Sequence, residues 1–109
     1  MKYVLFSFLA LFFLSGCASL RITGTSEIYE GTGHGYRGAI TVQVHMSGGI
    51  ITDIVILYSR EDPFVGEAAM EELIDLVIMY NTTDLDAVSG ATGSSKGFLE
   101  AVENAILGR

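Results

Sequence analysis

Apolar and polar residues alternate with a period of two in the segment 39–46, "AITVQVHM". The apolar members of this alternation are Ile40, Val42, Val44 and Met46. Such a pattern is typical of a β-strand with one buried face. "SGG" (47–49) has turn chemistry, and the β-branched run 50–59 predicts a second strand, antiparallel to the first. Because this second strand is apolar on both sides, we expect both of its faces to be covered.

Two later segments show helical periodicity. A helix is predicted to open near Pro63, with an apolar stripe at Met70, Leu73, Ile74, Val77 and Ile78. A second helix is predicted over 94–108, with Ser94 or Ser95 as its N-cap and Phe98, Val102, Ala105 and Ile106 facing inward. Strands followed by helices predict a small α+β domain: an antiparallel sheet, made of the hairpin and a short edge strand, packed with two helices.

Several motif matches fail in their context. Gly33, Gly35 and Gly38 fit G-x-G-x-x-G, but a strand follows this glycine-dense segment where a dinucleotide site needs a helix. "GSSKG" (93–97) fits the nucleophile elbow of hydrolases, yet neither His nor Asp follows Ser95. His34 is expected in a loop formed by the glycine-dense segment and His45 on the polar face of the first strand, so the two histidines share no metal-ligand spacing. We therefore predict no catalytic residue and no metal site.

The N-terminal region has the pattern of an export signal. Lys2 precedes an apolar run, 4–14, that is too short to span a bilayer as a helix but fits a signal-peptide core. "LSGC" (14–17) resembles the lipobox of bacterial lipoproteins, which implies cleavage after residue 16 and lipidation of Cys17. Cys17 is the one cysteine of the chain, so no intrachain disulfide is expected. We expect a signal peptide over 1–16, a tether over 17–28 and one domain over 29–109.

The charge of the chain narrows the class of partner. Its 109 residues carry a formal net charge of −7, and loss of Lys2 with the signal would make the mature body more acidic. Nucleic-acid binding demands a basic surface, so we expect no nucleic-acid partner.

The start of the second predicted helix has a cation where one is unfavourable. Lys96 in a first turn opposes the helix dipole. The placement is favourable if an anion binds there, held by free backbone N–H groups, Ser94, Ser95 and Lys96 together. A phosphate group is the natural candidate.

The segment "DAVSGAT" (86–92), followed by "GSSKGFLEAVENAI", closely resembles the flavinylation motif of the FMN-binding domain family. Members include domains of the sodium-translocating NADH:quinone reductase and of the Rnf complex. The family pattern, D-x-x-[ST]-G-A-[TS], is matched at Asp86, Ser89, Gly90, Ala91 and Thr92. The resemblance covers about 29–107. One departure is "PFVG" (63–66), where Phe64 replaces the first glycine of a P-G-x-G element.

The resemblance implies a covalent cofactor. Thr92 would carry FMN through a phosphodiester, attached from FAD by a separate magnesium-dependent flavin transferase that releases AMP. Asp86 would act in motif recognition or in a turn, while Ser89, Gly90 and Ala91 shape the approach to Thr92. Gly33, Gly35 and Gly38 would let the isoalloxazine ring lie close to backbone, with Tyr36 as its aromatic neighbour.

The function expected from these features is electron relay by a flavoprotein anchored by lipid outside the cytoplasm, facing the periplasm or the cell surface. Its redox partners would be membrane-bound or extracytoplasmic proteins. Two alternatives stay open. One is a ligand-binding or structural lipoprotein that holds FMN non-covalently or not at all, and the other is an enzyme that reduces a small molecule itself.

Overall fold

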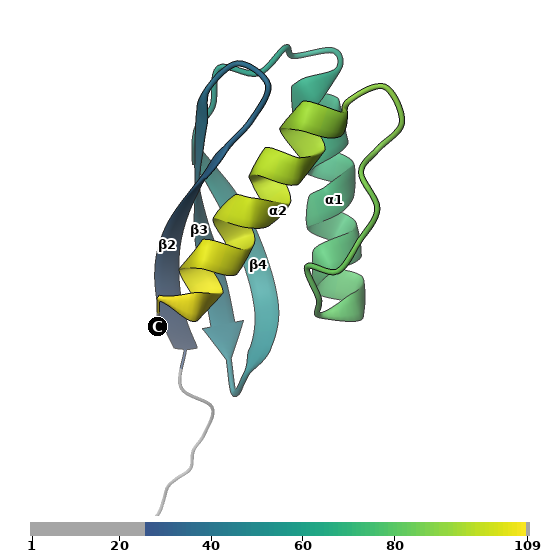
Figure 1. Cartoon of the computed structure of the whole chain (residues 1–109). Coiled ribbons are helices and arrows are strands. Elements are labelled where there is room, and N and C mark those ends of the chain that lie inside the picture. Colours follow the sequence, from purple (N-terminus) through teal and green to yellow (C-terminus); the bar gives the residue numbers. More distant parts are fainter. Residues whose placement is uncertain (1–25, 109) are drawn as a thin grey trace, which may run out of the picture.

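A computed structural model describes residues 26–108 of the chain. Three strands, β2 (Ser26–His34), β3 (Ala39–Ser47) and β4 (Ile50–Tyr58), form one antiparallel sheet in the order β2-β3-β4. Two helices follow, α1 (Gly66–Tyr80) and α2 (Thr92–Leu107). Figure 1 shows α2 lying across β2 and β3 with α1 beside β4, so that both helices pack on one face of the sheet. The predicted α+β fold is confirmed.

The edge strand β2 is longer than the sequence predicted. It spans nine residues, as many as β3 and β4, and begins at Ser26, within the segment expected to be a tether. The glycine-dense segment expected to be a loop therefore forms most of a strand. The physical reason is close packing: a Cβ on Gly31 or Gly33 would collide with the backbone of α2, at Ala101 and Gly97 respectively. The glycines let the helix lie directly on the strand.

The predicted core is confirmed in its main positions. The four apolar residues of β3 are buried, and they pack with Met70, Leu73 and Val77 of α1 and with Phe98, Val102 and Ala105 of α2. Ile74, Ile78 and Ile106 are partly buried at the edge of this core.

The prediction that both faces of β4 are covered is wrong for its outer face. The irregularity in the β3–β4 register between His45 and Met46 shifts the strand by one residue, so that Ile51 and Ile54 both point into the core although they are three positions apart. Ile50, Val55 and Leu57 remain exposed, and nothing in residues 26–108 lies over them. The sheet therefore has one covered face, as antiparallel sheets commonly do.

The β3–β4 hairpin is tied to the end of α1. Gly48 and Gly49 both have positive φ, 59° and 83°, as a two-residue hairpin turn requires. Asn81 adopts the left-handed conformation that ends α1, and its Oδ1 accepts a hydrogen bond of 2.9 Å from the backbone N–H of Ile51.

Both helices start at residues other than those predicted. α1 begins at Gly66, after a turn in which Oδ1 of Asp62 accepts the N–H groups of Phe64 and Val65. α2 begins at Thr92 with Ala91 as N-cap, so the prediction that Ser94 or Ser95 caps this helix is wrong. Both serines lie within the first turn and are buried there.

The predicted signal peptide, the lipidation site Cys17 and most of the tether lie outside the described residues. Within 26–108, neither helix has the length and apolar character needed to cross a membrane.

Candidate functional site

A cavity of about 550 Å³ lies at the end of the molecule where three connections meet. Its walls are the β2–β3 loop with Tyr36 and Arg37, the start of α1 with Asp62, Val65 and Gly66, and the segment 90–94 at the start of α2. This end is at the top of Figure 1. The volume falls within the range usual for small-molecule sites. Segments far apart in the sequence thus form one site.

The approach to α2 is a tight turn that only glycine fits well. The backbone N–H of Ala91 donates to the carbonyl of Val88 at 3.0 Å, and Gly90 between them has φ of 86°. A turn with this dihedral at its third residue favours glycine strongly. The motif glycine therefore has a conformational role, which turns the chain directly into the helix.

The first turn of α2 presents unused donors to the cavity. No side chain caps the helix, so the N–H groups of Thr92, Gly93 and Ser94 have no intrahelical partner. They lie at the positive end of the helix dipole and within the wall of the cavity. Such an arrangement binds anions, phosphate groups in particular.

The hydroxyl side chains in the first turn of α2 are of two kinds, exposed and buried. Thr92 is exposed and lines the cavity. Ser95 is completely buried, and its Oγ accepts the backbone N–H of Val88 at 3.0 Å. Ser94 lines the cavity but is buried, and its hydroxyl donates to Oε1 of Glu61. The two serines expected to hold a phosphate bond to other protein groups, Ser95 to the Val88 backbone and Ser94 to the Glu61 carboxylate, which leaves Thr92 with the accessible hydroxyl on this wall.

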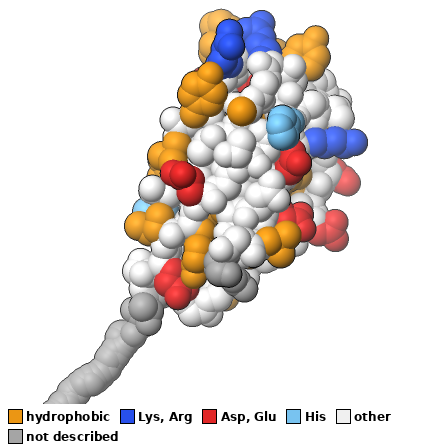
Figure 2. Space-filling view, turned by 60° about the vertical axis from the view of Figure 1, so that its left-hand side comes forward, with side chains coloured by type: hydrophobic (Ala, Val, Ile, Leu, Met, Phe, Trp, Pro, Cys, Tyr) orange, Lys and Arg blue, Asp and Glu red, His pale blue; other side chains and the backbone are white. Residues whose placement is uncertain are grey.

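The basic side chain that lines the cavity is not the one that the sequence predicted. Lys96 lies in the second turn of α2, is exposed, and does not line the cavity. Arg37 does line it. Figure 2 shows Lys and Arg side chains beside apolar ones at the upper end of the molecule. The sequence offered a weak signal for Arg37, namely its place beside Tyr36 in the loop "GYRG".

The remaining predicted site residues lie around the cavity without lining it. Ser89 and Asp86 are exposed on the loop before Gly90, and neither is among the lining residues. Gly35 faces inward, where a Cβ would stand 2.5 Å from the Ile40 side chain and 2.9 Å from the Glu61 carboxyl carbon. Its missing side chain thus makes room for protein atoms, which replaces the expectation that it lets a flavin ring approach the backbone.

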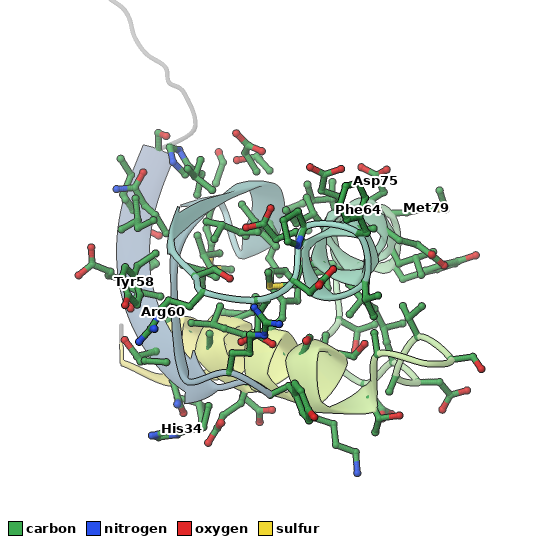
Figure 3. The ribbon with its side chains drawn as sticks, turned by 90° about the horizontal axis from the view of Figure 1, so that it is seen from above. His34, Tyr58, Arg60, Phe64, Asp75 and Met79 are labelled. Atoms are coloured by element: carbon green, nitrogen blue, oxygen red, sulfur yellow. The ribbon has the colours of Figure 1, made fainter. Side chains whose placement is uncertain are left out.

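Tyr36 is brought next to the motif. Its side chain is 82% exposed, and a Cβ built on Gly93 would lie 3.1 Å from the Tyr36 Cβ. The Tyr36 side chain thus lies next to Gly93, the residue that follows Thr92. Phe64, the departure from the family pattern, is 89% exposed and does not line the cavity. Figure 3 shows it on the outer side of α1, in the direction of Asp75 and Met79.

The FMN-binding domain family model matches residues 35–107. The chain belongs to the FMN-binding domain family. It is 37% identical over 102 residues to a urocanate reductase of Eggerthella lenta, which covers 85% of this chain and 17% of the relative. It is 35% identical over 78 residues to an NADH:acrylate oxidoreductase of Vibrio harveyi, with 72% and 8% covered. An uncharacterized Treponema pallidum protein is 30% identical over 80 residues, with 72% and 22% covered. The chain thus spans less than a quarter of each relative.

The cavity fits FMN on its own geometry. The uncapped helix start suits the phosphate group, and Arg37 adds a positive charge from the β2–β3 loop wall. Tyr36 offers an exposed aromatic face for a flat ring system, and Val65 adds apolar surface. In residues 26–108 no cluster of three His, Cys, Asp or Glu side chains could hold a metal ion.

Proposed function

We propose that this FMN-binding domain carries its flavin covalently on Thr92 and relays electrons between other redox centres. The observation that carries the proposal is the position of Thr92. It has the exposed hydroxyl in the cavity wall, at a helix start whose first N–H groups are unused. A phosphate bonded to its Oγ would remain within reach of those donors.

The attachment needs an external enzyme. The Oγ of Thr92 loses its proton and bonds to the FMN phosphorus of FAD, while the pyrophosphate bond breaks and AMP leaves. A threonine hydroxyl is a weak nucleophile that needs an adjacent base. In the described residues, the carboxylates nearest the cavity accept backbone or Ser94 hydrogen bonds, as Glu61 and Asp62 do. A separate flavin transferase is therefore the partner we propose for this step.

The relay role rests on what the chain offers around the cavity. When bound, FMN supplies one- and two-electron chemistry. This chain's own residues supply binding and orientation: Arg37 and the N–H groups of α2 hold the phosphate, and Tyr36 flanks the ring. We propose that here the donor and the acceptor are separate proteins.

The place of the relay follows from the N-terminal sequence. We propose that Cys17 is lipidated after cleavage and anchors the domain to a membrane outside the cytoplasm. Covalent attachment suits that location, since a flavin that dissociated there would be lost by diffusion.

Intact mass after coexpression with a flavin transferase tests the attachment. We expect the wild-type chain to gain one FMN minus water, and Thr92→Ala to gain nothing. Thr52→Ala is the matched control, because Thr52 is an exposed threonine on β4 that lies outside the motif and does not line the cavity. It should retain the full mass gain. Persistent flavin on Thr92→Ala would move the attachment to another residue.

The same measurement separates the alternative function. If the wild-type protein binds FMN in its folded form but releases all of it on denaturation, the domain is a non-covalent flavin carrier and the covalent proposal fails.

Labelling with fatty acid tests the anchor. Cys17→Ser should abolish incorporation of labelled palmitate and leave the precursor uncleaved by the lipoprotein route, because the thiol is the acceptor. Incorporation by the variant at the level of the wild type would contradict the anchor assignment.

A further inference from the structure

Glu61 is a buried carboxylate that joins three segments of the cavity. It is 4% exposed. Its Oε1 accepts the backbone N–H of Tyr36 at 3.0 Å, and its Oε2 accepts that of Arg37 at 2.9 Å. Ser94 in the first turn of α2 donates its hydroxyl to Oε1 as well. One side chain thus connects the β2–β3 loop, the approach to α1 and the start of α2.

The neighbouring backbone is shaped around this carboxylate. A Cβ on Gly35 would lie 2.9 Å from Oε2, and a Cβ on Gly66 would lie 2.7 Å both from the Glu61 Cβ and from the Ser94 Oγ. Two glycines on different segments therefore leave the space that the carboxylate and its partners fill. Glu61 is thus packed closely between the segment of Gly35 and the segment of Gly66.

Stability alone does not account for a charge in this place. Burying a carboxylate costs solvation free energy, and a neutral side chain of the same shape avoids that cost. The salt bridge found in residues 26–108 joins His34 and Glu100, away from Glu61. The carboxylate is balanced instead by two backbone N–H groups and one hydroxyl, all belonging to segments that line the cavity.

We propose that Glu61 is a positioning residue that holds the Tyr36–Arg37 loop against the first turn of α2 and so forms the flavin cavity before flavin enters. The proposal rests on the proposed function, since the cavity is assigned to FMN there. Apart from these contacts the loop is exposed, as Tyr36 and Arg37 themselves are. Their backbone N–H groups are what Glu61 holds, and their side chains are what the cavity uses.

The consequence for binding is a matter of pre-organisation. A loop held in the binding conformation adds no ordering cost when the ligand arrives. If the loop left that conformation, the apparent FMN affinity would fall by the fraction of molecules that remain competent. Glu61 therefore acts on FMN through Tyr36 and Arg37, without touching the cofactor.

Hydrogen exchange in the flavin-free full chain tests the position of the loop directly. E61Q keeps the volume but replaces one acceptor oxygen by an NH₂ group, which cannot accept from an N–H. We expect the amides of Tyr36 and Arg37 to exchange about tenfold to a hundredfold faster, the range that corresponds to losing one charge-assisted hydrogen bond. S94A removes the third contact and leaves both N–H acceptors, so these two amides should stay protected.

FMN titration of the same proteins, followed by flavin fluorescence, tests the consequence. We expect the Kd of E61Q to rise about tenfold or more, in step with the loss of protection. The matched control is E100Q: Glu100 also accepts a backbone N–H, that of His34 at 2.9 Å, but His34 does not line the cavity, whereas Tyr36 and Arg37 do. Its Kd should equal that of the wild type. If E61Q does not fold, E61D carries the test, because it keeps the charge and withdraws the carboxylate.

Wild-type exchange at Tyr36 and Arg37 in E61Q, together with wild-type FMN affinity, would overturn the positioning role. A wild-type chain that binds no free FMN and gains no FMN mass with an active flavin transferase would instead overturn the proposed function. The exchange comparison would then still decide whether Glu61 holds the loop, so the two failures are distinguishable.

Discussion

Gly93 separates the two residues that contribute most to the proposed flavin site. Thr92 precedes it in α2, and the Tyr36 side chain packs across it from the β2–β3 loop. The space between a Cβ at this position and the Tyr36 Cβ would be 3.1 Å, tighter than an ordinary van der Waals contact. Tyr36 would need to shift by only a few tenths of an ångström, which an exposed residue can do while Glu61 still holds its backbone N–H. A side chain added at position 93 should therefore act on FMN binding and on fold stability in opposite directions.

Gly93→Ala should weaken FMN binding without destabilising the fold. Displacing Tyr36 removes part of the aromatic contact, so we expect the Kd for FMN to rise several-fold. Alanine in the first turn of a helix is more favourable than glycine by up to about 1 kcal/mol, so the melting temperature should stay level or rise. Thermal melting and FMN titration of the same variant check both signs. An unchanged Kd would show that Tyr36 does not contribute to binding.

At the scale of elements, the contact between β2 and α2 sets the geometry of the site. Gly31 and Gly33 on the strand face Ala101, Ala105 and Gly97 on the helix. Small residues on both surfaces let the two backbones approach closely, and this approach brings the end of β2 beside the start of α2. The β2–β3 loop then reaches the cavity wall that carries Thr92. A bulkier strand would lift the helix and separate the two walls.

Gly33→Ala should destabilise the protein clearly. A Cβ there meets the carbonyl oxygen of Gly97, which is backbone and cannot rotate away. Overpacking of this kind costs roughly 1–3 kcal/mol in the free energy of unfolding. Urea denaturation measures the loss. The control is Glu30→Ala, on the exposed face of the same strand, where surface substitutions usually change stability by less than about 0.5 kcal/mol.

At the scale of the whole molecule, the core and the cavity are separate parts of the structure. The buried apolar residues of β3, α1 and α2 form one cluster beneath the sheet. The cavity lies at one end, lined by loop and helix-start residues that are outside this cluster. Nothing in the core therefore requires a cofactor to fill it.

The chain should fold cooperatively without flavin. We expect the apoprotein to show one sharp thermal transition, with its core amides protected from exchange, because the apolar cluster is complete without a ligand. Added FMN should raise the transition temperature, because binding at a hundred times the Kd stabilises the folded state by about 2.7 kcal/mol. Calorimetry with and without FMN checks both points. A broad, non-cooperative apo transition would contradict this independence of core and site.

The amino-acid sequence was enough to predict that the hairpin strands and both helices exist, and to assign the motif to its family. Apolar positions repeat every 2 residues around Val42 in the strand and about every 3.6 residues around Leu73 in the helix. This repeat depends only on which face of the element is buried. The motif 86–92 could be assigned because its residues are contiguous. The glycines of β2 were predicted as a loop because glycine has weak strand propensity. What opposes that propensity is the nearby backbone of α2, which the local sequence does not show.

Only the tertiary structure decided which side chains reach the site. Ser94, Ser95 and Lys96 are neighbours of Thr92 in sequence, yet a helix turns successive residues by about 100° and sends them to different surroundings. Two of them enter the interior and one points to solvent. Arg37 and Glu61 lie far from the motif along the chain and next to it in space. A carboxylate becomes a buried anchor only when other segments bring N–H and O–H donors to it, and those donors exist as a set only in the folded chain.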